Sequence, residues 1–163
     1  MKKALSVVLA AVMVAMVAAT SAVSFAKAGN NGLIGMPNPF VRCETMEEAK
    51  AVAGFDMTVP AKAAGCKQVW INAVRDNMIQ VCYQSKSNEV RIRKAKGWQE
   101  NLDGDYNVYS NTKYRFIAYK LVKERGEERI YSALWYSKGY TYSVTATNGM
   151  KQESVNKIVK AVV

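Results

Sequence analysis

Apolar side chains recur at helical spacing in two short segments, one around residue 50 and one at the C-terminal end of the chain. In the first, the apolar positions within residues 46–53 lie three and four residues apart, which places them on one face of a helix. Thr45 and Glu48 form a capping box, in which each side chain bonds a backbone N–H left free by the first turn. Gly54 tolerates the left-handed conformation that ends many helices. The pattern therefore predicts a short helix over residues 46–53.

Between the two helical segments the period of apolar positions falls to two, as in strands with one buried face. Phe55, Met57 and Val59 begin this alternation. Runs typical of strands follow at residues 68–74, 78–84, 89–94, 113–123, 128–136 and 140–146. Several of the turns between them contain residues that hairpin loops favour, namely Asp76, Asn77, Gly126 and Gly139. Because such short connections force neighbouring strands to run antiparallel, we expect a meander of about six or seven strands.

The second helical segment closes the chain. Its apolar positions share one face and its lysines lie opposite, with Val155, Ile158, Val159 and Val162 on the first and Lys157 and Lys160 on the second. A helix at each end of an antiparallel meander defines an α+β fold, with both helices packed on one face of the sheet.

The first 26 residues have the three-part layout of a cleavable secretory signal. Lys2 and Lys3 supply the positive start, residues 4–19 form an uncharged apolar run, and Ala26 ends a small-residue cleavage sequence. An uncleaved membrane anchor needs about 20 apolar residues, more than this run offers. We therefore expect cleavage after Ala26 and a protein that is secreted or held in the periplasm or cell envelope, without a membrane-spanning segment.

The mature chain is expected to consist of a leader and one domain. Residues 27–37 are rich in Gly and Asn, lack apolar periodicity and predict a flexible leader. Residues 38–163 carry all the predicted helices and strands, and their number suits a single α+β domain.

The charge balance is strongly basic, with 23 Lys and Arg against 13 Asp and Glu. Loss of the signal removes two lysines and no acidic residue, which leaves an excess of eight positive charges. Such an excess favours solubility and attracts anionic partners. Export would exclude nucleic acid as a partner and leave an anionic envelope component, such as lipid headgroups or wall polymers, or another envelope protein.

The three cysteines, Cys43, Cys66 and Cys82, would enter a compartment in which disulfides persist. Their odd number leaves at least one thiol free or paired between molecules. In a hairpin that turns at residues 75–77, Cys82 would face Trp70, four residues from Cys66. Four strand residues span about 13 Å, more than the roughly 7 Å that a disulfide bridges, which disfavours a Cys66–Cys82 pair. Pairing through Cys43 stays open.

The whole chain contains no histidine. This removes the Ser-His-Asp and Cys-His arrangements, because no imidazole is present to act as the base, and it removes the usual zinc and non-haem iron ligand sets. No glycine-rich phosphate loop and no CxxC motif occurs. We therefore expect no cofactor, and the sequence favours a protein that is not an enzyme.

The densest group of polar residues lies at positions 100–107. Asn101, Asp103, Asp105 and Asn107 alternate along the chain and supply the oxygen ligands of a calcium loop. The EF-hand glycine is misplaced, however, and the final bidentate glutamate is missing, so a solvated turn is the favoured interpretation. Glu100 with Asp103 or Asp105 also offers a carboxylate pair of the kind that hydrolyses glycosides at separations of about 5–10 Å, although surface loops commonly carry such pairs.

A basic run lies just before this loop. Arg91 and Arg93 share one strand face, and Lys94, Lys96 and Trp98 follow. Guanidinium groups placed in this way hold phosphate or carboxylate groups with paired hydrogen bonds. The alternative is a charged, solvated sheet face that discourages aggregation. These five residues are the candidate ligand-binding residues.

Large aromatic residues are frequent in the second half of the domain. They line a groove or, as is more usual on alternating strand positions, fill the core; those concerned are Trp98, Trp135, Tyr136, Tyr140 and Tyr142.

Several short motifs occur in a shared order that resembles a known family. They are Asn38-Pro39, Glu47-Glu48-Ala49, Ala53-Gly54-Phe55, Val59-Pro60, Val90-Arg91-Ile92-Arg93-Lys94-Ala95, Gly104-Asp105-Tyr106-Asn107, Ala133-Leu134-Trp135 and Tyr140-Thr141-Tyr142-Ser143, followed by the closing amphipathic helix. In this order they resemble the exported bacterial proteins of the domain-of-unknown-function family 4367, over most of residues 38–163. The resemblance implies a bacterial extracytoplasmic domain, in some relatives the outer part of membrane-bound proteins like anti-sigma factors. It implies no catalytic residue, and the three cysteines are not part of the pattern.

The sequence leaves three functional hypotheses. The leading hypothesis is a non-enzymatic binding or regulatory module of the bacterial envelope, because export, basic charge and a single domain coincide with missing catalytic motifs. The rival is a carboxylate-based hydrolase of cell-wall glycans that uses Glu100 with Asp103 or Asp105. A purely structural or interaction protein without a small ligand is a third alternative.

Overall fold

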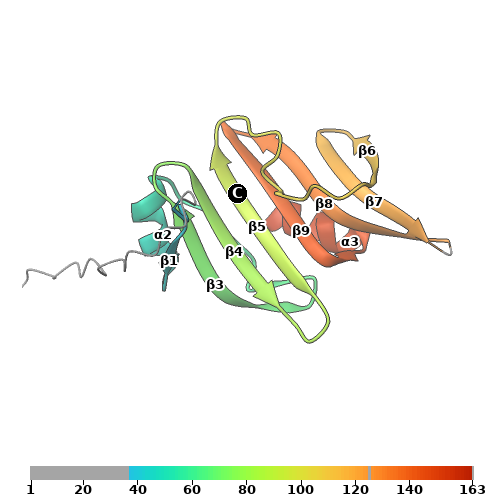
Figure 1. The fold of residues 1–163 in the computed structure, drawn as a ribbon, viewed down its shortest axis with the longest axis horizontal. Coiled ribbons are helices and arrows are strands. Elements are labelled where there is room, and N and C mark those ends of the chain that lie inside the picture. Colours follow the sequence, from blue (N-terminus) through green and yellow to red (C-terminus); the bar gives the residue numbers. More distant parts are fainter. Residues whose placement is uncertain (1–36, 125, 163) are drawn as a thin grey trace, which may run out of the picture. The chain divides into compact units, whose positions relative to one another are not determined.

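The computed structural model describes residues 37–124 and 126–162, which form one open antiparallel sheet with two helices on one of its faces (Figure 1). The predicted signal peptide and nearly all of the predicted leader lie outside the described residues. The elements are β1 (Val41–Cys43), α2 (Met46–Ala53), β2 (Lys62–Ala63), β3 (Cys66–Val74), β4 (Met78–Gln84), β5 (Glu89–Lys96), β6 (Ser110–Tyr114), β7 (Ile117–Glu124), β8 (Glu127–Ser137), β9 (Tyr140–Met150) and α3 (Gln152–Ala161).

The α+β class is confirmed, but the expected strand number of six or seven was too low, because the sheet has nine strands. Relative to the six named runs, two of the additional strands, β1 and β2, contain three and two residues, too few to show a period, and the alternating residues 55–59 form no strand. The third arises because the run predicted over residues 113–123 is a hairpin of β6 and β7. Its turn consists of Arg115 and Phe116, which carry none of the usual hairpin signals.

The sheet is also not one continuous meander. Its strand order is β1-β3-β4-β5-β9-β8-β7-β6, with β2 paired to β3. After β5 the chain therefore passes over three strand positions to the far edge and then returns strand by strand until β9 pairs with β5. The connection, residues 97–109, is here called the crossing loop. In Figure 1 it runs in front of β9 and β8, on the face opposite to α3.

The face that carries the helices, here the inner face, holds the core. One row of paired positions crosses the sheet from β3 to β8 and is buried throughout, consisting of Ile71, Val81, Ile92, Val144 and Ala133. Each row of this kind joins residues that the alternation places on one face. The opposite outer face carries more polar residues, and the crossing loop lies against it.

The first helix has the boundaries that the sequence predicts, and the second buries the predicted apolar face. In α2, the Thr45 side chain accepts a bond from the Glu48 N–H at 3.1 Å, and Gly54 adopts a φ of 77° at the C-terminal end. The Glu48 carboxylate reaches back to the Glu44 N–H at 2.8 Å, one residue before the N-cap. In α3, Val155 and Ile158 are buried against the sheet. Each helix thus buries one stripe on the inner face, as expected for a two-layer domain.

The three cysteines are free and buried. Cys82 pairs with Trp70 in the β3–β4 hairpin, as predicted, so it lies four residues from Cys66. Cys43 pairs with Ile71, five residues from Cys66, which is about 16 Å along the strand. Both separations exceed the span of a disulfide.

None of the helices among the described residues is long and apolar enough to cross a membrane.

We predict that all three thiols are unreactive in the folded protein and reactive after unfolding without a reductant. Burial raises the pKa of the Cys43 and Cys82 thiols, which lowers their thiolate fraction, and Cys66 is fully buried. Alkylation followed by mass spectrometry should add no label to the native protein and three labels in denaturant. Fewer than three labels in denaturant would reveal a disulfide and contradict the prediction.

Candidate functional site on the outer sheet face

The crossing loop is fixed to the sheet at its first residues. The Gly97 N–H donates to the Gly139 carbonyl at 2.9 Å, and the Thr141 hydroxyl donates to the Gly97 carbonyl at 2.7 Å. The same hydroxyl oxygen accepts from the Gln99 N–H at 2.9 Å. Thr141 is fully buried, so these bonds satisfy a polar side chain that would otherwise cost free energy.

Asp103 attaches the middle of the loop to the second half of the sheet. Its carboxylate accepts from the Ser132 hydroxyl at 2.7 Å and pairs with the Lys120 ammonium at 2.7 Å. Lys120 also donates to the Asp105 carbonyl at 2.6 Å. The Asp103 side chain is only 4% exposed and that of Lys120 29%, so this ion pair is largely shielded from water.

Arg93 attaches the same part of the loop to the first half of the sheet. It donates from Nη1 to the Leu102 carbonyl and from Nε to Gln80 Oε1, each at 2.7 Å. Burial lowers the pKa of the guanidinium, and the neighbouring Arg91 adds to this shift. The loop approaches so closely that a Cβ on Gly104 would lie 2.8 Å from Arg93 Nη1, and Gly104 has a φ of 64°. Both observations explain the glycine at this position.

The last part of the loop forms its own polar cluster. The Asp105 carboxylate accepts from the Tyr109 hydroxyl at 2.7 Å and from the Asn107 side-chain amide at 2.7 Å. Burial raises the pKa of Asp105, but these bonds and the charge of Lys120 outweigh it, so the pKa lies below its usual value. Burial and the bond to Asp105 raise the pKa of Tyr109.

On one side of the crossing loop lies a groove of about 480 Å³, here called the outer groove, which the β6–β7 hairpin closes on its other side. Trp98, Ala118 and Leu134 contribute apolar surface to it, and the Asp103–Lys120 pair and Ser132 lie in its lining. Further polar groups come from Glu100, Asn101, Asn111, Thr112 and Lys113. The outer groove therefore combines apolar walls with amides, a hydroxyl and a neutralised ion pair.

On the other side of the loop lies a smaller pocket of about 270 Å³. It is lined by polar groups that include Glu89, Arg91, Asp105, Asn107, Tyr109 and Thr145. Arg91 pairs with Glu89 at 2.6 Å within this lining.

The structure separates the candidate basic residues. Arg91 and Arg93 lie on the outer face, as their alternation predicts, but Arg91 pairs with Glu89 and Arg93 holds the loop. Lys96 is exposed at the end of β5, and Trp98 is 63% exposed and meets the Tyr136 ring edge-on at 5.9 Å.

Lys94 points to the inner face instead. Its ammonium donates to the Asp56 carbonyl at 2.6 Å and lies 4.4 Å from the centre of the Tyr140 ring. The Phe55 and Tyr142 rings each lie 5.5 Å away. Burial lowers the pKa of this amine. Lys94 thus contributes to packing between the β5–β9 strands and the segment after α2, away from the other candidates.

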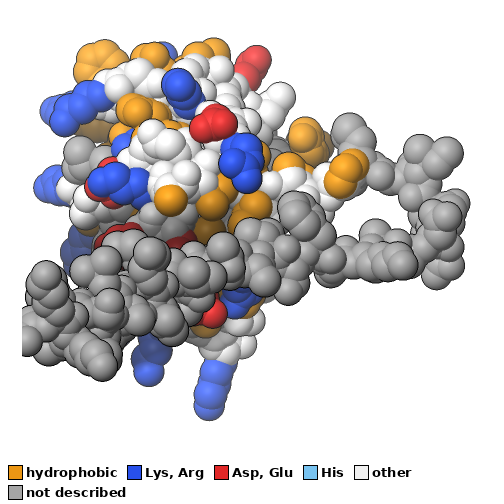
Figure 2. Space-filling view, turned by 90° about the vertical axis from the view of Figure 1, so that its left-hand side faces the viewer, with side chains coloured by type: hydrophobic (Ala, Val, Ile, Leu, Met, Phe, Trp, Pro, Cys, Tyr) orange, Lys and Arg blue, Asp and Glu red, His pale blue; other side chains and the backbone are white. Residues whose placement is uncertain are grey.

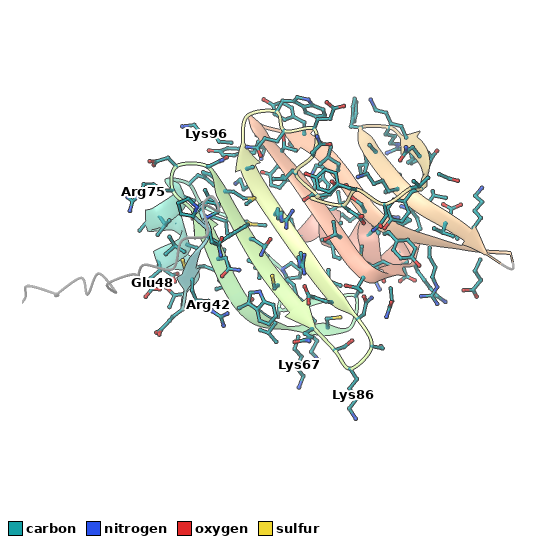
Figure 3. All side chains as sticks on the ribbon, in the orientation of Figure 1. Arg42, Glu48, Lys67, Arg75, Lys86 and Lys96 are labelled. Atoms are coloured by element: carbon teal, nitrogen blue, oxygen red, sulfur yellow. The ribbon has the colours of Figure 1, made fainter. Side chains whose placement is uncertain are left out.

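The basic charge of the domain is spread over its surface. Lys and Arg side chains stand out on much of the described surface in Figure 2, with fewer Asp and Glu among them. Figure 3 shows Lys96 and Arg75 toward the top of the view, Arg42 at the lower left, and Lys67 and Lys86 at the bottom.

The two carboxylates of the calcium hypothesis are directed to different partners. Asp103 is bound by Lys120 and Ser132, and Asp105 by Tyr109 and Asn107. Among the described residues, no three carboxylates or thiols come close enough together to hold a metal ion. Of the hydrolase pair, Glu100 and Asp103 both line the outer groove, whereas Asp105 lines the smaller pocket.

Sequence reasoning missed the partners of the loop. Lys120 and Ser132 are distant in sequence from Asp103, and nothing local links them to it. Tyr109 binds Asp105, only four residues away, but it lies in a segment without a period. The alternation favoured the core for the aromatic residues, and the structure agrees only for some of them. The rings of Trp135 and Tyr142 stack in the core with their centres 5.4 Å apart, but Tyr136 is 46% exposed.

The fold is an α+β domain in which a loop crosses the outer face of an open antiparallel sheet, and comparison with known families identifies its family. The chain matches the family described as domain of unknown function (DUF4367) over residues 69–162 and belongs to that family. The matched span begins inside β3, so the motifs before residue 69 lie outside it. No curated protein and no solved structure matches the chain.

We predict that Asp103→Asn lowers the free energy of unfolding by about 2–3 kcal/mol. The change leaves the Lys120 charge without its partner in a shielded position, although Lys120 keeps some contact with water. The matched control is Lys123→Met, which removes the pair with Glu128, whose side chains are 74% and 43% exposed. That loss should cost less than about 1 kcal/mol in urea unfolding. Equal effects of the two variants would contradict the role assigned to Asp103.

Proposed function

We propose that this protein is an exported, non-enzymatic binding module of the bacterial cell envelope whose ligand is a glycan chain bound in the outer groove. The observation that carries the proposal is the lining of that groove, in which apolar walls face amide and hydroxyl groups. Ligand sites typically combine apolar surface with a few polar groups that fix orientation.

The charges in the outer groove favour an uncharged ligand. Asp103 and Lys120 neutralise each other, and Glu100 and Lys113 contribute one charge of each sign. A sugar ring presents an apolar face that packs on a ring such as Trp98, and its hydroxyls suit amides, which both donate and accept. Asn101 and Asn111 supply such amides on opposite sides of the groove, one from the loop and one from β6.

The interactions of the loop support binding rather than hydrolysis. Asp103 is held by Lys120 and Ser132, so it has no free geometry in which to act on a glycosidic bond together with Glu100. The outer groove instead offers a fixed surface, because the crossing loop and the β6–β7 hairpin on its two sides are both attached to the sheet. Preformed sites of this kind lower the ordering cost of binding.

Export is supported by the N-terminal sequence. Lys2, Lys3, the apolar run and the small residues up to Ala26 together form a secretory signal. An envelope location would also bring the domain to wall glycans.

We predict that the mature protein begins at Lys27 and is recovered outside the cytoplasm. Expression of the full chain in a bacterial host, followed by fractionation and N-terminal sequencing, tests this. Replacing both Lys2 and Lys3 by Glu should retain the precursor in the cytoplasm, because the positive start directs the signal. A full-length chain in the cytoplasmic fraction would contradict export.

We predict that soluble glycan strands prepared from cell wall bind the protein in a saturable manner and that Ala118→Trp weakens binding by about tenfold or more. Ala118 is exposed and lines the outer groove, so a large side chain there fills the groove without entering the core. The control is Ala51→Trp, on an exposed position of α2. Isothermal titration gives the affinities.

The same titrations separate the rival function. Binding without release of new reducing ends supports a binding module. Release of reducing ends that Glu100→Gln abolishes would establish the hydrolase instead. If neither binding nor cleavage occurs, the assignment of the outer groove to glycans is wrong.

A further inference from the structure

Four exposed aromatic side chains gather at one end of the sheet, whereas a fifth, Tyr106, lies in the crossing loop. Phe116 is 85% exposed, Trp98 and Tyr114 are each 63% exposed, and Tyr136 is 46% exposed. Large aromatics normally bury most of their surface, so several exposed together mark an interaction site.

The strand register shows that these residues share one end. Lys96, at the end of β5, pairs with Tyr140 at the start of β9, and Ser137, at the end of β8, pairs with Tyr140 too. Ile117, which begins β7 after the β6–β7 turn, pairs with Trp135. We call residues 96–98, 113–116 and 136–139 the aromatic end; it lies at the top of the sheet in Figure 1.

The aromatic end is also basic. Its three segments contain Lys96, Lys113, Arg115 and Lys138 and no acidic residue. All four side chains belong to exposed residues, and none forms an ion pair with another described residue. The Arg115 guanidinium lies over the Tyr114 ring, 5.5 Å from its centre. The nearest acidic residue along the first segment is Glu100, and the adjacent β3–β4 turn carries Arg75 next to Asp76.

The β6–β7 turn contains residue types that hairpin turns do not favour. Arg115 has a φ of 54°, a conformation that two-residue hairpin turns usually assign to Asn, Asp or Gly. An arginine and a phenylalanine at these positions add nothing to the core, since both are exposed. Residues kept in an unfavourable conformation often serve a function.

From these observations we propose that the aromatic end docks on an anionic phospholipid surface. Amphipathic aromatic rings favour the interface between water and acyl chains, and neighbouring lysines and arginines are attracted to anionic headgroups. A protein partner would also use aromatic residues and arginine, but lysine is depleted in protein interfaces, and three of the four cations here are lysines. This surface differs from the outer groove, although Trp98 and Lys113 border both.

The proposal gives a role to cations that lie outside the candidate basic strand. Arg91, Arg93 and Lys94 are occupied within the fold, whereas the cations of the aromatic end face water. Docking by this end would place the sheet upright on the membrane. The outer groove would then face sideways and stay open to a second ligand.

Sedimentation with lipid vesicles tests the proposal on the purified mature protein. Wild-type protein should sediment with vesicles of phosphatidylcholine and phosphatidylglycerol and not with vesicles of phosphatidylcholine alone. Binding should weaken between low salt and about 0.15 M salt, since headgroup attraction is screened. The emission of Trp98 should shift to the blue on binding, and Trp98→Phe should remove that shift.

The variants are chosen at exposed positions, so that folding is unaffected. Phe116→Ser and the double variant Arg115→Glu/Lys138→Glu should each lower vesicle affinity by about tenfold or more. The matched control, Lys67→Glu/Lys86→Glu, makes the same charge change at the opposite end of the sheet, as Figure 3 shows. It should retain most of the binding.

Three results would overturn the proposal. They are no sedimentation of the wild type with anionic vesicles, an equal loss of binding in the control and the test variants, and lipid-free self-association that Phe116→Ser abolishes. The last result would mean that a second copy of the chain covers the aromatic end. Glycan binding is measured separately and is not expected to change in Phe116→Ser, so failure here leaves the outer groove untouched.

Discussion

The structure depends on a polar connection that crosses one face of its sheet. A chain segment laid over a sheet takes its own polar groups and those beneath it out of water, which is costly unless they pair. Here Arg93 comes from the first half of the sheet, and Lys120 and Ser132 come from the second. Because all three bind residues 102–105, the loop adds a second tie between the two halves, whose strands pair through β5 and β9.

This attachment also determines what the outer face offers. The loop divides the face into two hollows, and the residues that attach it consume the charges that lie there. What remains accessible in the larger hollow is mainly apolar and amide surface, with Glu100 and Lys113 supplying one charge of each sign. Four of the unpaired cations lie instead at one end of the sheet, beside exposed rings. One polar connection therefore separates a neutral groove from a basic, aromatic end.

The sequence predicted those parts of the fold that depend on interactions between neighbouring residues. The Thr45 cap, the Gly54 stop, the hairpin that sets Cys82 opposite Trp70 and the apolar stripe of α3 all follow from neighbouring residues. The Arg115–Phe116 turn escaped prediction because its residues contradict the usual turn preferences. The role of Asp103 was hidden for another reason, since its partners Lys120 and Ser132 are distant in sequence and join it only after the sheet has formed.

The strand order has a consequence for a chain that is made from its N-terminus. The β3, β4 and β5 strands can pair as soon as they are complete, but β9 follows β5 only after β6, β7 and β8. Until then β5 is the last strand of a partial sheet, with one row of backbone groups unpaired. Charged side chains on such an edge oppose its pairing with other chains. Arg91, Arg93 and Lys94 lie on β5. Although β5 is a central strand of the finished sheet, it therefore carries the charged residues that protect an edge strand until β9 has been made.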